Sequence, residues 1–178
     1  MNINQLKYVL AAAASSSMRE ASTKLYVSCD STCAIDDTGG YMVILTREQY
    51  EAIVAHAKEN FPLEACGLIG GRLDGEAKTV EKVYLLTNTD ASEEHFSMDP
   101  NEQFAAVKDM RSRGIGLLGN FHSHPATPSR PSEEDKRLAY DTKASYLILS
   151  LAEEEPALNS FQIDSDKNIT KEELRILD

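Results

Sequence analysis

The chain runs FHSHPATPSRPSEED over residues 121–135, and this stretch holds its most informative pattern. It begins at the end of an apolar run, residues 115–121, which predicts a central strand of a sheet. On a continuing strand, His122 and His124 are two residues apart and project from the same face. Pro125 ends the strand, so both imidazoles are expected at an edge or mouth of the sheet.

Asp135 follows the two histidines at the start of a predicted helix. Ser132 and Asp135 have the spacing of a capping box, S-x-x-D, so the helix is expected from Ser132 to about residue 142. The loop 125–131 can fold Asp135 back toward the histidines. Two imidazoles and one carboxylate form a zinc site that keeps a fourth position for water. We therefore predict one zinc ion per chain, held by His122, His124 and Asp135, although iron and cobalt also suit this donor set.

Hydrolysis at such a site needs more than the metal. Zinc lowers the pKa of bound water toward about 7, but a base must still take the proton and pass it to the leaving amine. Glu64 is the candidate base, because it follows Pro62 at a helix-to-strand junction where a side chain can point into a cleft. The Ser132 hydroxyl is the candidate donor to a developing oxyanion. Taken singly, Ser132 is a plain helix cap and Glu64 an ordinary exposed carboxylate, so only their combination favours catalysis.

The combination resembles the JAMM motif of the MPN+ metallopeptidase family, whose positions are occupied here by Glu64, His122, His124, Ser132 and Asp135. The segment PLEACGLIGG, residues 62–71, is also similar to that family's segment around its catalytic glutamate. The resemblance extends over about residues 42–165. It implies an α/β, cytidine-deaminase-like layered fold with a curved mixed β-sheet flanked by helices.

The resemblance also implies an activity. His122, His124 and Asp135 would bind zinc. Glu64 would activate the water, and Ser132 would stabilise the oxyanion. The expected substrate is a peptide or isopeptide bond next to the C-terminal glycines of a ubiquitin-like protein. Because the chain is short and has no long insertion, it is more similar to compact bacterial members that process sulfur-carrier proteins, and we expect such a carrier as the partner.

The flanking sequence predicts one α/β domain over residues 41–178. Apolar patterns indicate strands at 42–45, 66–73, 79–87, 115–121, 146–152, 158–163 and 169–174, and helices at 47–60, from 100 and from 133. In the second helix, which Asp99 caps, we expect Phe104, Val107 and Met110 to face the core. Strands mixed with helices in this way are typical of a layered α/β domain.

Residues 1–40 are predicted to be a helical appendage followed by a linker. Residues 1–28 resemble the first two helices of the helix-turn-helix in LysR-type regulators. In that family a recognition helix follows and enters the major groove. Here residues 29–40, CDSTCAIDDTGG, contain no basic residue, so we interpret the appendage as a truncated or fused fragment. A transcription regulator that uses residues 1–28 is a further hypothesis, which salt-dependent binding to duplex DNA would support.

The composition limits partners and location. The 178 residues include 29 acidic and 18 basic ones, a formal net charge of -11, which disfavours nucleic acid as a main partner. Three cysteines are too few for a disulfide framework, and no apolar run approaches the roughly 20 residues of a membrane helix. We therefore expect a cytoplasmic protein that does not bind membranes. Its oligomeric state stays open.

The remaining cysteine and histidine residues are weaker ligand candidates, and the same fold admits a second function. Cys66 as a fourth ligand would close the site, so a buried strand residue is the better interpretation. The remaining candidates lack a matching ligand set and are expected to be structural or at the surface: Cys29, Cys33, His56 and His95. The alternative function is a non-catalytic MPN module that binds a ubiquitin-like protein. The complete set of five motif residues argues against it, whereas tight carrier binding without zinc would support it.

Overall fold

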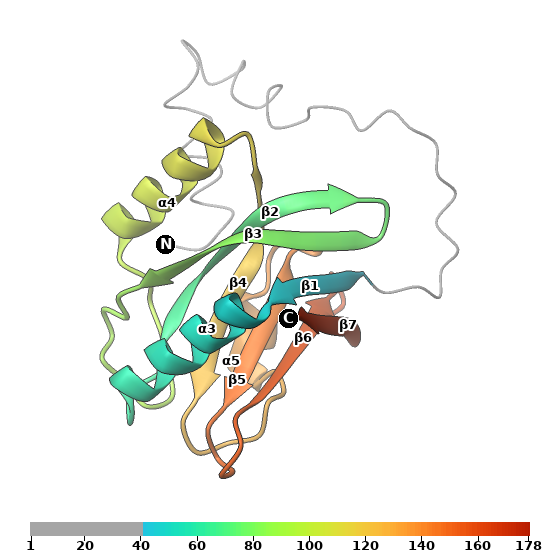
Figure 1. Cartoon of the computed structure of the whole chain (residues 1–178). Helices are drawn as coiled ribbons and strands as arrows, with labels where there is room; N and C mark the ends of the chain where they lie inside the picture. Colours follow the sequence, from blue (N-terminus) through green and yellow to red (C-terminus); the bar gives the residue numbers. More distant parts are fainter. Residues whose placement is uncertain (1–40) are drawn as a thin grey trace.

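The computed structural model describes residues 41–178, which form a mixed α/β domain (Figure 1). Its elements follow the order β1 (Met42–Thr46), α3 (Arg47–Asn60), β2 (Cys66–Asp74), β3 (Ala77–Leu86), α4 (Pro100–Ser112), β4 (Gly116–His124), α5 (Glu133–Leu138), β5 (Ser145–Ser150), β6 (Ala157–Ile163) and β7 (Ile169–Leu177). The predicted appendage, residues 1–40, and its helix-turn-helix resemblance lie outside the described residues. None of the helices formed by residues 41–178 combines the length and apolar character that a membrane crossing requires.

The strands of the described region form one mixed sheet that closes on itself in the order β1-β3-β2-β4-β5-β6-β7. Strand β1 makes the closure, because it pairs in parallel with both β3 and β7: Met42 lies opposite Ala77 on one side and opposite Glu173 on the other. Strand β4 lies antiparallel to β2 and parallel to β5. The prediction of a mixed sheet flanked by helices is confirmed. A curved sheet was predicted from the sequence, and the observed sheet also closes into a barrel.

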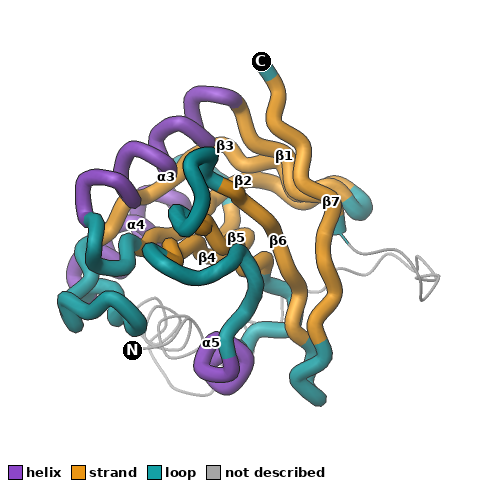
Figure 2. Tube along the Cα trace, turned by 90° about the horizontal axis from the view of Figure 1, so that it is seen from below, coloured by secondary structure: helices purple, strands orange, loops and turns teal. Residues whose placement is uncertain are grey.

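Helices cover the sheet from different sides. Figure 2 shows α3 and α4 beside the strands at one end of the molecule and α5 apart from them. Helix α3 buries Ile53 and Ala57 in a core cluster that also contains Phe121 of β4. Helix α4 buries Met110 in a second cluster that contains Cys66 of β2. The cores therefore enclose the neighbouring strands β2 and β4, on which the candidate site is built.

Two local predictions were wrong. The helix expected up to residue 142 ends at Leu138, because Ala139 adopts an extended conformation and is buried in a third core cluster. Phe104, expected to face the core, is 41% exposed. Helix α4 buries Gln103 instead, whose side-chain amide donates to the Met98 carbonyl at 2.8 Å. A polar side chain with an internal hydrogen-bond partner thus occupies the buried face that the aromatic ring was expected to fill.

Candidate metal centre

Strand β4 carries two histidines to one end of the sheet. The strand continues past the predicted 115–121 as far as His124, and β2 and β5 pair with it on either side. His122 and His124 are only 2% and 5% exposed. As alternate residues of a strand they share one face, and their Nε2 atoms lie 3.0 Å apart. Pairing on both edges thus holds two converging imidazole nitrogens in a fixed frame.

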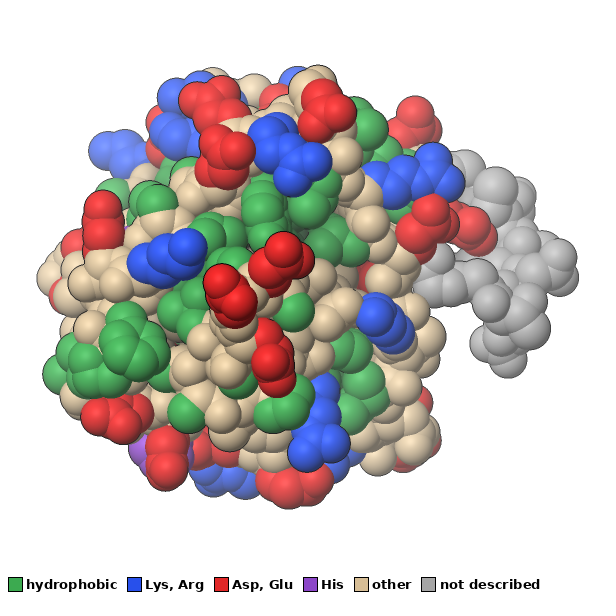
Figure 3. Space-filling model, turned by 60° about the horizontal axis from the view of Figure 1, so that its bottom comes forward, with side chains coloured by type: hydrophobic (Ala, Val, Ile, Leu, Met, Phe, Trp, Pro, Cys, Tyr) green, Lys and Arg blue, Asp and Glu red, His purple; other side chains and the backbone are tan. Residues whose placement is uncertain are grey.

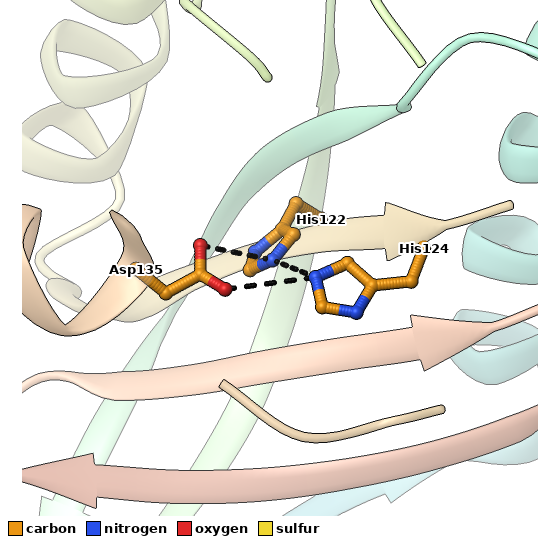
Figure 4. Close-up of side chains that lie close together, drawn as sticks. All are labelled: His122, His124 and Asp135. Atoms are coloured by element: carbon orange, nitrogen blue, oxygen red, sulfur yellow. Dashed lines mark hydrogen bonds and ion pairs between the residues drawn. The ribbon is translucent and has the colours of Figure 1, made fainter. Parts of the chain in front are cut away.

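Asp135 joins this pair from the first turn of α5. Its backbone N–H donates to the Ser132 hydroxyl at 3.1 Å, and the Ser132 N–H donates to Asp135 Oδ2 at 2.8 Å. The predicted capping box is therefore present, and it holds the carboxylate toward the histidines (Figure 4). Asp135 Oδ1 lies 3.3 Å from His122 Nε2, and Oδ2 lies 3.6 Å from His124 Nε2.

The spacing of these side chains fits a single metal ion. One ligand atom from each of His122, His124 and Asp135 lies within 4.8 Å of the others. In a tetrahedral site with ligands about 2.1 Å from the metal, neighbouring ligand atoms are about 3.4 Å apart. The separations here, 3.0 to 3.6 Å, bracket that value. Two imidazoles and one carboxylate also form the donor set of open zinc sites, so geometry and chemistry agree.

The cluster shifts the pKa of two of its members. Burial lowers the pKa of His124, but hydrogen bonds with Asp135 and the Pro128 carbonyl outweigh burial and raise it above its ordinary value. Burial raises the pKa of Asp135, yet the neighbouring charge of His122 and hydrogen bonds from both histidines hold it well below its usual range. Asp135 is therefore ionised at neutral pH, as a metal ligand must be.

Glu64 lies between α3 and β2 and lines a cleft of about 320 Å³ together with Ser132 and Asp135. Its backbone is held on both sides, because its N–H donates to the Ser92 carbonyl at 2.8 Å and its carbonyl accepts from the Asn88 amide at 2.9 Å. Glu64 is only 5% exposed, and burial raises its pKa to about 8. A carboxyl group that titrates near neutrality is suited to transferring a proton in both directions.

The structure brings the predicted site residues together in two groups. Glu64, Ser132 and Asp135 line the cleft. His122 and His124 are buried and are linked to the cleft through Asp135. The carboxylate of Asp135 is therefore the element shared by the ligand cluster and the open cleft.

The loop between β3 and α4 also contributes to the site, a contribution that the sequence patterns did not predict. Asn88 organises this loop: its Nδ2 donates to the carbonyls of Glu64 and His95 at 2.9 and 3.0 Å. Its Oδ1 accepts from the backbone N–H groups of Asp90 and Ser97, both at 3.1 Å. All four hydrogen-bonding positions of the amide are thus used. An asparagine in a polar loop is so common in turns that nothing in the sequence pattern singles it out.

The same loop places two rings at the site. Phe96 stacks on His122 with ring centroids 4.7 Å apart and planes at 21°. His95, expected to be structural or at the surface, is half exposed, and its Nδ1 lies 2.5 Å from Glu134 Oε2 on α5. His95 and Glu134 both line the cleft. His95 is therefore part of the cleft wall, outside the cluster of ligand atoms.

The other candidates within the described residues have structural roles, as predicted. Cys66 is fully buried and its Sγ donates to the Leu86 carbonyl at 3.7 Å. Burial raises the pKa of this thiol to about 12, so it stays protonated. His56 Nε2 lies 3.3 Å from the same Leu86 carbonyl. Cys29 and Cys33 lie outside the described residues.

The fold and the site together define a class of protein. Its members are α/β domains with an H-x-H strand, an aspartate at a helix start and a buried glutamate that lines the same cleft as the aspartate. The chain belongs to the family of prokaryotic homologs of the JAB domain, whose sequence profile matches residues 46–164. The matched range contains every residue of the candidate site.

Two relatives and one solved structure are similar over much of the domain. The "CysO-cysteine peptidase" of Mycobacterium tuberculosis is 29% identical over 139 residues, which cover 78% of this chain and 93% of that protein. The "Desampylase" of Haloferax volcanii is 31% identical over 111 residues, 60% of this chain and 78% of that protein. A solution structure of a Desulfitobacterium hafniense protein shares 58% identity at a TM-score of 0.70, covering 76% of this chain and 92% of that one.

Proposed function

We propose that this chain is a zinc-dependent peptidase that cleaves a peptide or isopeptide bond after the C-terminal Gly-Gly of a ubiquitin-like or sulfur-carrier protein. The observation that carries the proposal is the convergence of His122, His124 and Asp135 within 4.8 Å, with Asp135 lining the same cleft as Glu64. The family supports the reaction class, and the names of the mycobacterial and haloarchaeal relatives support the kind of substrate. The cytidine-deaminase-like layering and the cytoplasmic location remain predictions.

His122, His124 and Asp135 are the proposed zinc ligands. Bound by them, zinc supplies Lewis-acid chemistry and lowers the pKa of water at an open position to about 7. His124 Nδ1 lies 3.1 Å from the Pro128 carbonyl, and this hydrogen bond leaves the Nε2 lone pair free for the ligand cluster. The chain therefore presents two imidazole nitrogens and one negative oxygen to the ion.

Glu64 is the proposed general base. Its carboxylate takes a proton from the attacking water and delivers it to the nitrogen of the leaving group. Burial raises its pKa to about 8, and a cation at the neighbouring ligands favours the charged form that accepts the proton. Ser132, at the same cleft, is the proposed donor to the developing oxyanion.

The cleft suits a thin, uncharged or basic chain. Several of its lining residues are acidic, including Asp90, Glu94 and Glu134, and among the lining residues of the described region there is neither lysine nor arginine. Over the face shown in Figure 3, acidic and basic side chains are interspersed, and the basic ones gather into no continuous patch. Two glycines carry no side chain and no charge, so they can enter such a cleft without steric or electrostatic conflict.

A mass-spectrometric cleavage assay tests the proposal. The substrates are sulfur-carrier proteins extended beyond Gly-Gly, either by single residues or through the amine of a lysine side chain. The zinc-loaded protein is expected to release the extension and leave a carrier that ends in Gly-Gly. If the protein binds zinc but cleaves neither kind of extended carrier, the proposed substrate is wrong.

A further inference from the structure

Phe96 lies outside the motif, yet it touches one of the candidate ligands directly. Its ring stacks on the His122 imidazole with centroids 4.7 Å apart and planes at 21°. Phe96 also packs against the core cluster that contains Met98 and Leu86. The Phe96 side chain therefore contacts both a packed core and the His122 imidazole.

The two histidines are held in different ways. His124 Nδ1 lies 3.1 Å from the Pro128 carbonyl, a hydrogen bond that fixes both the ring and its tautomer. His122 Nδ1 is buried, and no group among residues 41–178 gives it a hydrogen-bond partner. Histidines that bind metals almost always have such a partner on the second ring nitrogen. Apart from the contact of Nε2 with Asp135, the orientation of the His122 ring therefore depends on packing.

Phe96 can supply this packing because its neighbours are anchored. The Ser97 N–H donates to Asn88 Oδ1 at 3.1 Å, and the Ser97 carbonyl accepts from the Thr89 N–H at 2.8 Å. On the other side, the His95 carbonyl accepts from the Asn88 amide at 3.0 Å. The backbone on both sides of Phe96 is thus tied to one asparagine, which keeps the ring in place over His122.

We propose that Phe96 is a positioning residue, whose ring fixes the plane of the His122 imidazole so that Nε2 faces His124 and Asp135. Without the ring, His122 samples other orientations, and the apparent metal affinity falls with the fraction of molecules that are competent to bind. The inference rests on the metal site of the proposed function, but not on the reaction or its substrate.

Cobalt(II) binding tests this role, because cobalt suits the same donor set and its absorption bands report the ligand geometry. Phe96→Leu keeps apolar bulk but removes the flat ring, and Phe96→Tyr keeps the ring at this half-buried position. Phe104→Leu is the matched control, since Phe104 is 41% exposed on α4. Affinities are measured by competition with a chromophoric chelator, and the metal-free variants are compared by thermal unfolding.

We expect Phe96→Leu to bind cobalt about tenfold more weakly than the unchanged protein, with altered absorption bands, as for the loss of other supports of metal-binding histidines. Phe96→Tyr and Phe104→Leu should keep both affinity and spectrum. If Phe96→Leu does not fold, Phe96→Met, with similar volume, takes its place. Unchanged affinity and spectrum in the folded variant would overturn the role of Phe96. An unchanged protein that binds no cobalt would overturn the metal site itself.

Discussion

The Ser132 hydroxyl donates a hydrogen bond to Asp135 Oδ2 at 2.7 Å. The same carboxylate oxygen also accepts from the Ser132 backbone N–H at 2.8 Å. A hydroxyl has a single proton, so Ser132 cannot donate to Asp135 and to a developing oxyanion at the same time. The proposed role in catalysis therefore requires this hydroxyl to turn from Asp135 toward the substrate.

Replacing Ser132 separates its two roles. Ser132→Ala should lower kcat by about 10²–10³-fold, the usual effect of removing one oxyanion donor. The same change should cost about 1 kcal/mol of unfolding free energy, because the helix cap is lost. Ser132→Thr keeps the hydroxyl and the cap and should stay close to the unchanged protein. Steady-state kinetics with denaturant unfolding measure both effects, and an undiminished kcat in Ser132→Ala would exclude the oxyanion role.

Glu64→Gln tests the base while preserving the shape of the side chain. Turnover should fall by at least about 100-fold, because an amide cannot accept the proton. Zinc content should not change, since Glu64 lies outside the cluster of three ligand atoms. Glu94→Gln, which removes another carboxylate of the same cleft, serves as the control and should retain most activity. Normal turnover by Glu64→Gln would mean that another group moves the proton.

Metal affinity should fall as the pH is lowered. Protonation of His124 competes with metal binding, and its pKa is raised because hydrogen bonds with Asp135 and the Pro128 carbonyl outweigh burial. Asp135, whose pKa is held well below its usual range, stays ionised and adds no competition near neutral pH. Below the pKa of His124, affinity should drop about tenfold per pH unit for each proton displaced. Competition with a chelator between pH 5 and 8 measures the metal affinity. An affinity that does not change with pH would contradict the prediction.

Asn88 should be essential for the conformation of the loop between β3 and α4. Asn88→Asp keeps the shape but replaces the donor to the Glu64 and His95 carbonyls with an acceptor. The unmet carbonyls and the repulsion between oxygens should cost about 1–3 kcal/mol of unfolding free energy. Asn101→Asp makes the same change at an exposed position in α4 and should be nearly neutral. Urea unfolding compares the unfolding free energies of the two variants. An equal loss in both would show that the loop does not depend on Asn88.

Local patterns predicted the parts of the site that depend on neighbours in sequence. Alternation along a strand placed His122 and His124 on one face, and the capping box placed Asp135 at a helix start. Both patterns involve residues that are close in sequence, so they do not depend on how distant elements pack. Phe104 shows the limit of this approach: its spacing fits the buried face, but Gln103 occupies that face through its hydrogen bond to Met98.

Contacts between distant segments were not predictable from these patterns. The pairing of Met42 with Glu173, which helps to close the sheet, joins the two ends of the domain. The stacking of Phe96 on His122 also joins separate segments, and neither residue carries a local signal for it. Such contacts depend on where whole elements pack, which hydrophobic periodicity does not encode.

Zinc content per chain, measured after loading and extensive dialysis, tests the central claim most directly. The unchanged protein should retain one zinc ion per chain and His124→Ala essentially none, because one of three ligands is lost. His95→Ala, at the cleft but outside the ligand cluster, should still retain one. No zinc in the unchanged protein, or a full equivalent in His124→Ala, would contradict a metal centre built on His122, His124 and Asp135.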